Sequence, residues 1–365
     1  MTDRDDTMPT MPTMLGVFLP GDSTAELRSY DVPTPGPGQV LLEVGASGIC
    51  GSDIGYIYRG YKSHKGLDGQ PAYHGVVAGH EPCGTVLATG PGVHRVGPGD
   101  RVIVYHIVGC GECRNCRAGY FISCTDATRR EAYGWQRDGG HAPYLLAEES
   151  TCIPLPDSLS FTDGSLIACG FGTAYEGLRR TDVNGADTLL VIGLGPVGLA
   201  AAMIARCLGV GRVIGVERTP GRIDFVKSTG LVDDIVVADD ASADAVLDLT
   251  SGSGCSVAVD CSGSVPGRST ALEGVAEWGR VSLLGEGGRL ETEVSDTLLH
   301  KQVTIHASWV TSLQGMEDLT ALLDRNKVNP EVVVSHRFAL SQADEAYRLA
   351  ADGAAGKVVL LPSAP

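Results

Sequence analysis

A short apolar segment followed by a glycine-rich turn constrains the fold of this chain more than any other feature. Residues 188–192, Thr-Leu-Leu-Val-Ile, form the continuous apolar run typical of a strand buried on both faces of a parallel sheet. The next six residues fit the pattern G-x-G-x-x-G, and a helical pattern follows them: Gly193, Leu194, Gly195, Pro196, Val197 and Gly198. In such a turn the glycines permit the sharp bend, the close approach of a pyrophosphate and the packing of helix on strand. The segment therefore predicts a dinucleotide-binding unit.

The residues that follow this turn alternate between strand-like and helix-like patterns. Five further apolar segments continue the series, at 212–217, 234–238, 256–260, 279–284 and 303–306. Six strands alternating with helices are the content of a doubly wound parallel sheet, so the predicted fold class is α/β. Cys261 and Leu284 lie at the ends of two of these strands and are candidates for contact with the cofactor.

An acidic residue ends the second of these strands and bears on which cofactor binds. Glu217 follows the glycine-rich turn by about 20 residues, where a carboxylate can bind a ribose 2′-hydroxyl. A 2′-phosphate would meet like charge there, so we expect NAD rather than NADP. Arg218 and Arg222 lie close by and could weaken this preference.

Length, charge and cysteine content narrow the class of protein. The 365 residues suggest two domains, and the formal net charge of -16 argues against nucleic acid or an anionic membrane as a partner. The first residues, 1–13, read as a flexible tail without the features of a signal peptide. Eleven cysteines without such a signal predict a cytoplasmic protein whose thiols bind metal rather than form disulfides.

Four cysteines lie close together in the pattern C-x₂-C-x₂-C-x₇-C: Cys110, Cys113, Cys116 and Cys124. Four thiolates at this spacing suit a closed, structural zinc site. An iron–sulfur cluster is the alternative, because such clusters also use four cysteines.

Three more residues suggest a second metal site. Cys50, His80 and Cys169 each lie beside glycine, in Gly48-Ile49-Cys50-Gly51, Gly79-His80 and Cys169-Gly170. Two thiolates and one imidazole make the Cys₂His set of a catalytic zinc, which leaves one coordination position open. Each residue alone would more often be a packing residue, so the prediction rests on the combination.

The segment before the doubly wound unit reads as a β domain. Short apolar strands at 40–44, 84–88 and 100–104 are separated by turns rich in glycine and proline, which indicates a barrel-like arrangement. The residues after the doubly wound unit predict two helices, at 316–326 and 341–352, followed by an apolar strand, 357–361, that is expected to return to this domain.

The order of these motifs resembles that of the zinc-dependent medium-chain alcohol dehydrogenases, from about residue 14 to 361. The resemblance implies a GroES-like β-barrel catalytic domain, residues 14–170 and 310–365, in which a Rossmann domain, residues 171–309, is inserted. It also implies two Zn²⁺ ions per chain, one catalytic and one structural, and a homodimer or homotetramer.

The resemblance assigns roles to individual residues. Cys50, His80 and Cys169 would hold the catalytic zinc, and Glu81 would lie near the metal or replace water on it. Ser52 matches the hydroxyl that takes the proton from the substrate, and Thr173 matches a residue beside the nicotinamide. The four clustered cysteines match the structural zinc lobe.

Two positions depart from the family pattern. Many members carry a histidine five residues after the first zinc cysteine, where this chain has Gly55, so we expect another route for the proton, with His106 as a candidate. Polyol and threonine dehydrogenases often have glutamate where this chain has Cys169, which here is more similar to the alcohol dehydrogenase branch.

The activity implied is reversible transfer of a hydride from a small secondary alcohol to NAD, giving a ketone. The segment 55–79, which borders the substrate cleft in the family, is rich in tyrosine, lysine and histidine and favours a polyol, sugar alcohol or other polar hydroxylated substrate. The alternative is that most of these residues form a solvated surface loop or a subunit contact. An activity like that of L-threonine 3-dehydrogenase is one alternative, because Tyr105-His106-Ile107 resembles a motif of those enzymes. A non-catalytic nucleotide-binding sensor is another, although the intact Cys₂His set argues against it.

Overall fold

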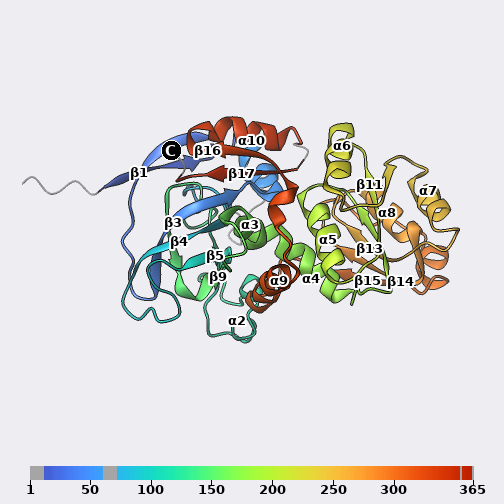
Figure 1. The fold of residues 1–365 in the computed structure, drawn as a ribbon, viewed down its shortest axis with the longest axis horizontal. Helices are drawn as coiled ribbons and strands as arrows, with labels where there is room; N and C mark the ends of the chain where they lie inside the picture. Colours follow the sequence, from blue (N-terminus) through green and yellow to red (C-terminus); the bar gives the residue numbers. More distant parts are fainter. Residues whose placement is uncertain (1–11, 61–71, 354–355, 364–365) are drawn as a thin grey trace, which may run out of the picture.

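The computed structural model of the protein describes residues 12–60, 72–353 and 356–363. It shows two bodies side by side (Figure 1), each built around its own large β-sheet. Of the expected tail, residues 1–11 lie outside the described ranges, and Thr13 already opens the first strand, β1 (Thr13–Phe18). No helix in the described part of the chain has the length and apolar character needed to cross a lipid bilayer.

One body contains a six-stranded sheet in which all neighbouring strands are parallel, in the order β12-β11-β10-β13-β14-β15. The bounds are β10 (Thr188–Ile192), β11 (Arg212–Glu217), β12 (Asp234–Val237), β13 (Cys255–Asp260), β14 (Val275–Leu283) and β15 (Thr304–Ala307). This order reverses between the central strands β10 and β13, where ligands bind at the carboxyl ends of the strands. The predicted doubly wound α/β sheet is confirmed.

Helices connect the parallel strands: α5 (Pro196–Cys207), α6 (Pro220–Thr229), α7 (Ser242–Leu249) and α8 (Val265–Gly274). Strand β10 is buried from Leu189 to Ile192, which explains its continuous apolar sequence. Helix α5 begins with Pro196, whose missing N–H would be unsatisfied at that position in any residue.

The other body contains a seven-stranded sheet in the order β16-β17-β3-β4-β5-β9, with β8 paired to β3. The bounds are β3 (Gln39–Gly48), β4 (Glu81–Thr89), β5 (Arg101–Val104), β8 (Tyr144–Glu148), β9 (Cys152–Pro154), β16 (Val334–Ala339) and β17 (Lys357–Leu361). The C-terminal strand β17 returns to this sheet and pairs antiparallel with the end of β3, at Val359 with Gly48.

The remaining strands and α-helices lie outside this sheet. They are β2 (Glu26–Asp31), which pairs with β1, the short pair β6 (Ile107–Val108) and β7 (Glu131–Ala132), and the helices α1 (Gly51–Asp53), α2 (Arg114–Arg117), α3 (Phe161–Leu166), α4 (Gly172–Arg180), α9 (Leu313–Asn326) and α10 (Ala343–Ala351).

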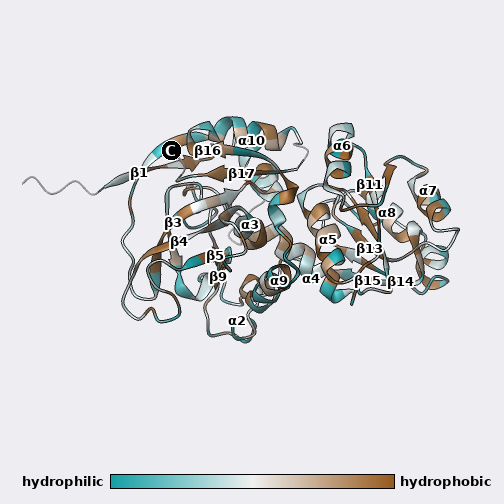
Figure 2. Cartoon of the chain, viewed as in Figure 1, coloured by the Kyte–Doolittle hydropathy of each residue, from teal (hydrophilic) through white to brown (hydrophobic). Residues whose placement is uncertain are grey.

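A single apolar cluster joins the two bodies. Phe171, Leu199 and Met316 belong to it and are at most 2% exposed. They come from the segment before α4, from α5 and from α9, so the helices between the sheets share one core. Figure 2 shows the same pattern, with β11 and β13 brown in the interior and both colours on α10 at the surface. This shared core fixes how the site residues of one body face those of the other.

Two elements begin earlier than the sequence predicts. Helix α9 starts at Leu313 rather than Met316, because the Ser312 hydroxyl accepts a hydrogen bond from the Gly315 N–H (2.9 Å) and caps the first turn. Strand β14 starts at Val275 rather than Gly279, because Val275 already pairs with Cys255 before an irregularity in the ladder.

Candidate metal centres and active site

Four predicted residues come together where β3 ends and β4 begins. The ligand atoms of Cys50, His80, Glu81 and Cys169 all lie within 4.8 Å of one another. Cys50 follows β3, whereas His80 and Glu81 stand at the start of β4, and the antiparallel pairing of Gly48 with Glu81 brings these two ends side by side. Cys169 arrives from a π-helical turn, residues 167–171. These residues are far apart in the sequence, and the pairing of β3 with β4 brings Cys50 close to His80 and Glu81.

Glycine at position 48 is required by this close approach. A Cβ atom there would lie 2.0 Å from Oε2 of Glu81 and 2.8 Å from Cε of Lys357, so any side chain would displace the acid from the cluster. Gly79 has φ +92°, and a Cβ atom there would lie 2.2 Å from the His141 ring. Gly48 and Gly79 are therefore steric requirements of the site, whereas Gly51 and Gly170 have room for a Cβ atom.

A buried carboxylate orients the histidine of the cluster. Oδ1 of Asp53 lies 2.7 Å from Nδ1 of His80, which leaves Nε2 for a metal. Oδ2 of Asp53 accepts a hydrogen bond from the Cys50 N–H (3.1 Å). Burial works against the charged imidazole, but Asp53 and Cys50 outweigh it and raise the pKa of His80. Asp53 thus fixes two candidate ligands at once.

The two thiols of the cluster differ in acidity. A hydrogen bond with Cys169 lowers the pKa of Cys50 well below its usual value, with help from His80 and against the effect of burial. The same contact and burial raise the pKa of Cys169. A metal cation bound among these groups would lower the pKa of both thiols and so favour their thiolate forms.

Glu81 is the fourth member of the cluster and is fully buried. Nζ of Lys357 lies 2.5 Å from its Oε2, whereas Oε1 has no hydrogen-bond partner among the described residues. Burial raises the pKa of Glu81 to about 7, and Lys357 opposes this shift. An unsatisfied carboxylate oxygen beside two thiols and an imidazole fits a metal ion, and this donor set is that of zinc.

The four clustered cysteines form a second group outside the sheet. The sulfur atoms of Cys110, Cys113, Cys116 and Cys124 also lie within 4.8 Å of one another. Backbone N–H groups donate to them, for example from Cys113 to Sγ of Cys110 (3.3 Å) and from Cys116 to Sγ of Cys113 (3.4 Å). Hydrogen bonds from the backbone N–H groups of Cys116 and Thr125 lower the pKa of Cys113 to about 5. Burial raises the pKa of Cys116 to about 12, so a bound cation would be needed to favour its thiolate form. Four cysteine sulfur atoms gathered this closely fit a closed zinc site.

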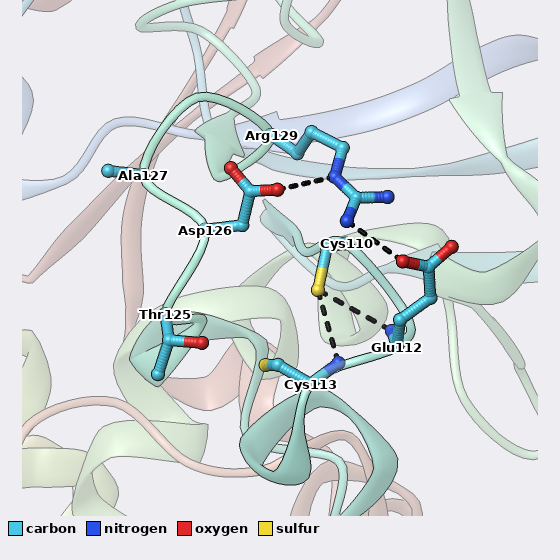
Figure 3. A pocket seen from close by; sticks show the side chains of 7 residues that line it. All are labelled: Cys110, Glu112, Cys113, Thr125, Asp126, Ala127 and Arg129. Atoms are coloured by element: carbon cyan, nitrogen blue, oxygen red, sulfur yellow. Dashed lines mark hydrogen bonds and ion pairs between the residues drawn. The ribbon is translucent and has the colours of Figure 1, made fainter.

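Charged side chains cover this lobe on its open side. Figure 3 shows Arg129 between two carboxylates, with Asp126 at 2.6 Å and Glu112 at 2.9 Å, close to Cys110. The Gly119 carbonyl accepts a hydrogen bond from the Leu313 N–H (2.9 Å), which ties the lobe to the start of α9.

An interdomain cavity of about 790 Å³ connects the first metal cluster with the glycine-rich turn. Nine of the predicted site residues line it: Cys50, Ser52, His80, His106, Cys169, Thr173, Val197, Cys261 and Leu284. Both sheets contribute, so one space holds candidate metal ligands and candidate cofactor contacts.

His106 lies on the wall of this cavity, next to His80. Its ring centroid is 5.4 Å from that of His80, and its Nδ1 donates to the Ala168 carbonyl (2.7 Å). Burial lowers the pKa of His106 to about 4, so the ring is neutral at pH 7. No hydrogen bond among the described residues joins Ser52 to His106, although both face the cavity.

The glycine-rich turn has the geometry that its pattern predicts. Gly193 has φ +83°, and a Cβ atom on Gly198 would lie 2.0 Å from the Gly193 carbonyl oxygen. Nothing lies within 4 Å of a Cβ atom built on Gly195, which leaves room for a ligand at the start of α5.

Glu217 lies at the end of β11 and is 4% exposed. Its carboxylate accepts hydrogen bonds from the N–H groups of Leu194 (3.0 Å), Arg218 (2.9 Å) and Thr219 (3.0 Å), and Arg222 lies 3.3 Å away. Glu217 therefore holds the glycine-rich turn in place. A ribose hydroxyl would have to share an oxygen that the backbone already uses.

Several residues of the site were not predicted from the sequence. Asp53 sits three residues after Cys50, a spacing that suggests a helix cap, and Lys357 is a charged residue at the head of an apolar strand. These two signals were available in the sequence. Arg130 and Trp135, which also line the cavity, carry no signal of their own.

The polar segment 55–79 lies partly outside the described residues, which omit 61–71 and thus Tyr61, Lys62, His64 and Lys65. Tyr56 lines the cavity. Tyr58 instead stacks on Tyr347 (5.4 Å between centroids), and Arg59 donates to the Ala351 carbonyl. Only part of this segment therefore faces the site.

Comparison with known proteins gives matches along most of the chain. The family model "Alcohol dehydrogenase GroES-like domain" matches residues 36–157, and "Zinc-binding dehydrogenase" matches residues 196–325. An uncharacterized zinc-type alcohol dehydrogenase-like protein of Escherichia coli, YphC, is 50% identical over 96% of this chain and 99% of its own length.

More distant relatives have stated activities. A sorbitol dehydrogenase of Halalkalibacterium halodurans is 30% identical over 90% of this chain and 93% of its own length. An L-threonine 3-dehydrogenase of Pyrococcus abyssi is 29% identical over 92% and 95%. Among solved structures, an NAD-dependent alcohol dehydrogenase superposes with a TM-score of 0.82 at 27% identity, over 95% of this chain and 99% of that one.

Proposed function

Because this chain belongs to the zinc-dependent medium-chain dehydrogenases, we propose that it oxidises a polar secondary alcohol reversibly to a ketone with NAD. The family makes the chain an oxidoreductase that uses zinc and a nicotinamide cofactor. The proposal adds NAD as the cofactor, two zinc ions per chain and a polyhydroxylated substrate. We also propose that the protein is cytoplasmic and forms a homodimer or homotetramer.

The interdomain cavity is the observation that carries this proposal. It brings Cys50, His80 and Cys169 into one space with Val197 of the glycine-rich turn. When bound, zinc supplies a Lewis acid for the substrate oxygen and NAD accepts the hydride. The residues around them determine orientation and the path of the proton.

Ser52 is proposed to take the proton of the substrate hydroxyl. It lines the cavity two residues after Cys50, and a hydroxyl can both accept and donate. His106 is proposed as the next proton acceptor. Its Nδ1–H is held by the Ala168 carbonyl, so Nε2 is the nitrogen free to accept. With a pKa of about 4, the ring would carry the proton only in passing.

The preference for NAD rests on Glu217. Its buried carboxylate stands where a 2′-phosphate would meet negative charge, and Arg222 offsets part of that charge. Its hydrogen bonds to the backbone hold the carboxylate in this position, so we expect KM for NADP to exceed KM for NAD.

The test is NADH formation with a panel of polyols, secondary alcohols and L-threonine, with and without a zinc chelator. We expect chelator-sensitive activity with a polyhydroxylated substrate. Cys50→Ser should abolish it, and Cys255→Ser, which alters a buried thiol in β13, should not. Activity with L-threonine alone would replace this substrate class by an amino alcohol. NADH binding without turnover in fully zinc-loaded protein would contradict the proposal and favour a nucleotide sensor.

A further inference from the structure

We propose that the substrate carries an anionic group, a carboxylate or a phosphate, and that Arg130 binds this group in the interdomain cavity. The inference rests on the proposed oxidation of a polar secondary alcohol. It narrows the substrate class to a polyhydroxy acid or a polyol phosphate rather than a neutral polyol.

Arg130 reaches the cavity from the segment that joins the four-cysteine lobe to β7. The residue is half-buried and lines the same cavity as Cys50 and His80. Its backbone N–H donates to the Asp126 carbonyl (3.1 Å), and its Nη1 donates to the Ile122 carbonyl (3.2 Å). These contacts anchor the arginine at the cavity wall.

The arginines on either side of Arg130 in the sequence are neutralised. Arg129 pairs with Asp126 and Glu112 on the lobe, and Arg137 pairs with Glu148 at 2.8 Å. Within the described ranges, Arg130 has no ion pair and makes one side-chain hydrogen bond. A guanidinium offers five N–H donors in a planar fork that suits carboxylate and phosphate. Most of these donors are therefore available to a ligand.

The two acids among the described residues of the cavity wall already have partners. Oε2 of Glu131 lies 3.8 Å from Nε of Arg137. Glu286 hydrogen-bonds to Tyr56 and thereby helps to raise the pKa of that tyrosine to about 12. Arg130 is thus the cation of the cavity wall that lacks a carboxylate in the described part of the chain. A partly buried cation without a counter-ion is costly, and an anionic substrate would supply one.

The wall beside the metal cluster suits a carbon chain. Trp135 packs edge-on against His80 (6.4 Å) and Tyr56 (6.3 Å), so an indole ring lies beside a candidate metal ligand on the cavity wall. A cavity of about 790 Å³ is within the size range of small-molecule sites. A polyhydroxy chain could therefore lie along Trp135, with its oxidised carbon at the metal cluster and its anionic end at Arg130.

The test compares each neutral polyol with its matched acid and phosphate, for example D-glucitol, D-gluconate and D-glucitol 6-phosphate, across several stereoisomers. The variants are Arg130→Gln, Arg130→Lys and the control Arg117→Gln, which alters an exposed arginine of α2 outside the cavity. We expect wild-type kcat/KM to favour one anionic series by roughly tenfold or more. Arg130→Gln should lower kcat/KM for that series roughly 30-fold, mainly through KM. Arg130→Lys should keep part of the wild-type kcat/KM for that series, and Arg117→Gln should have the same kcat/KM as the wild type.

The same data separate the ways in which the inference could fail. Chelator-sensitive oxidation of neutral polyols without preference for any anion would overturn the inference and leave the proposed function intact. A rise in KM for NAD with every substrate in Arg130→Gln would assign Arg130 to the cofactor, and would also overturn it. Comparing the acid and phosphate series identifies which anion is bound.

If no substrate is turned over, the proposed function is contradicted, and the anion site is then tested by a binding measurement. Thermal midpoints are measured with D-gluconate and with inorganic phosphate. A shift in wild type and Arg117→Gln that is lost in Arg130→Gln supports the anion site. Equal shifts in wild type and Arg130→Gln, or no shift in any of the three, would contradict it.

Discussion

The two candidate metal clusters of this protein are built in opposite ways. The four-cysteine cluster comes from one short stretch, 110–124, and backbone N–H groups of that stretch donate to its thiols. The cluster of Cys50, His80 and Cys169 is assembled from three distant segments. It needs buried charged partners, Asp53 for the histidine and Lys357 for Glu81. A local cluster suits a closed structural site, and an assembled cluster beside a cavity suits catalysis.

The largest effect is expected from removing a ligand of the assembled cluster. Cys50→Ser should lower kcat/KM by at least about 1000-fold, because the Lewis acid would be lost or misplaced. Zinc content should fall from two ions per chain to one, while NADH binding persists. Elemental analysis, fluorescence titration of NADH and initial rates measure these quantities. Near-normal turnover in this variant would remove the assembled cluster from catalysis.

The corresponding change in the local cluster should affect stability instead. Cys113→Ser should remove the other zinc ion and lower the free energy of unfolding by several kcal/mol, since binding of a structural zinc contributes to folding. Turnover of the molecules that remain folded should stay within about tenfold of the wild type. Thermal unfolding and active-site titration report the two effects. A folded, stable variant that has lost turnover would reverse the roles assigned to the clusters.

A smaller effect is expected from the partner of His80. Asp53→Asn keeps the shape of the side chain but weakens its hold on Nδ1, and such changes typically cost about 10- to 100-fold in metal affinity or activity. Zinc affinity is measured by competition with a chromophoric chelator. Asp163→Asn is the matched control, because Asp163 is also a buried helix-capping carboxylate but lies outside the cavity. Equal zinc affinity in Asp53→Asn and wild type would contradict this role.

The smallest effect concerns pH. His141 is fully buried between the Tyr347 hydroxyl (3.0 Å) and the Gly48 carbonyl (3.3 Å), and burial lowers its pKa to about 4. Below about pH 6.5 this histidine binds a proton in the unfolded chain but stays neutral in the folded chain. The free energy of unfolding therefore falls as pH falls from 6.5 toward 4. Between pH 7.5 and pH 5 this group alone should cost about 2 kcal/mol.

Urea unfolding of wild type and His141→Gln at both pH values measures this contribution. The variant is expected to be less stable at pH 7.5 but to lose less stability on acidification. An identical pH dependence in the two proteins would show that His141 does not titrate as its burial indicates.

The sequence predicts well what depends on neighbouring residues. The turn at Gly193–Gly198, the six parallel strands and the grouping of the four cysteines follow from local pattern, and the structure confirms the doubly wound sheet. The first residues of α9 and β14 were not predicted, because a serine cap determines where α9 begins and an irregular ladder determines where β14 begins. These features are local, but several residues compete for each role.

What depends on distant contacts could not be predicted from the sequence. Lys357 meets Glu81 only because β17 pairs with the end of β3. Among the described residues Arg130 forms no ion pair, unlike Arg129 and Arg137, and that difference appears only once the fold is known. The sequence predicts that Glu217 binds a ribose hydroxyl, but it does not indicate that the same carboxylate also accepts a hydrogen bond from the Leu194 N–H of the glycine-rich turn. Tertiary packing decides the partners of charged groups.

The most direct test of the contrast between the clusters is the optical spectrum of the protein with cobalt in place of zinc. Imidazole, a small neutral ligand, should change the cobalt spectrum only through a cluster with an open coordination position. The account predicts an imidazole-induced change in wild type and in Cys113→Ser, and none in Cys50→Ser. A change that survives in Cys50→Ser but disappears in Cys113→Ser would contradict it.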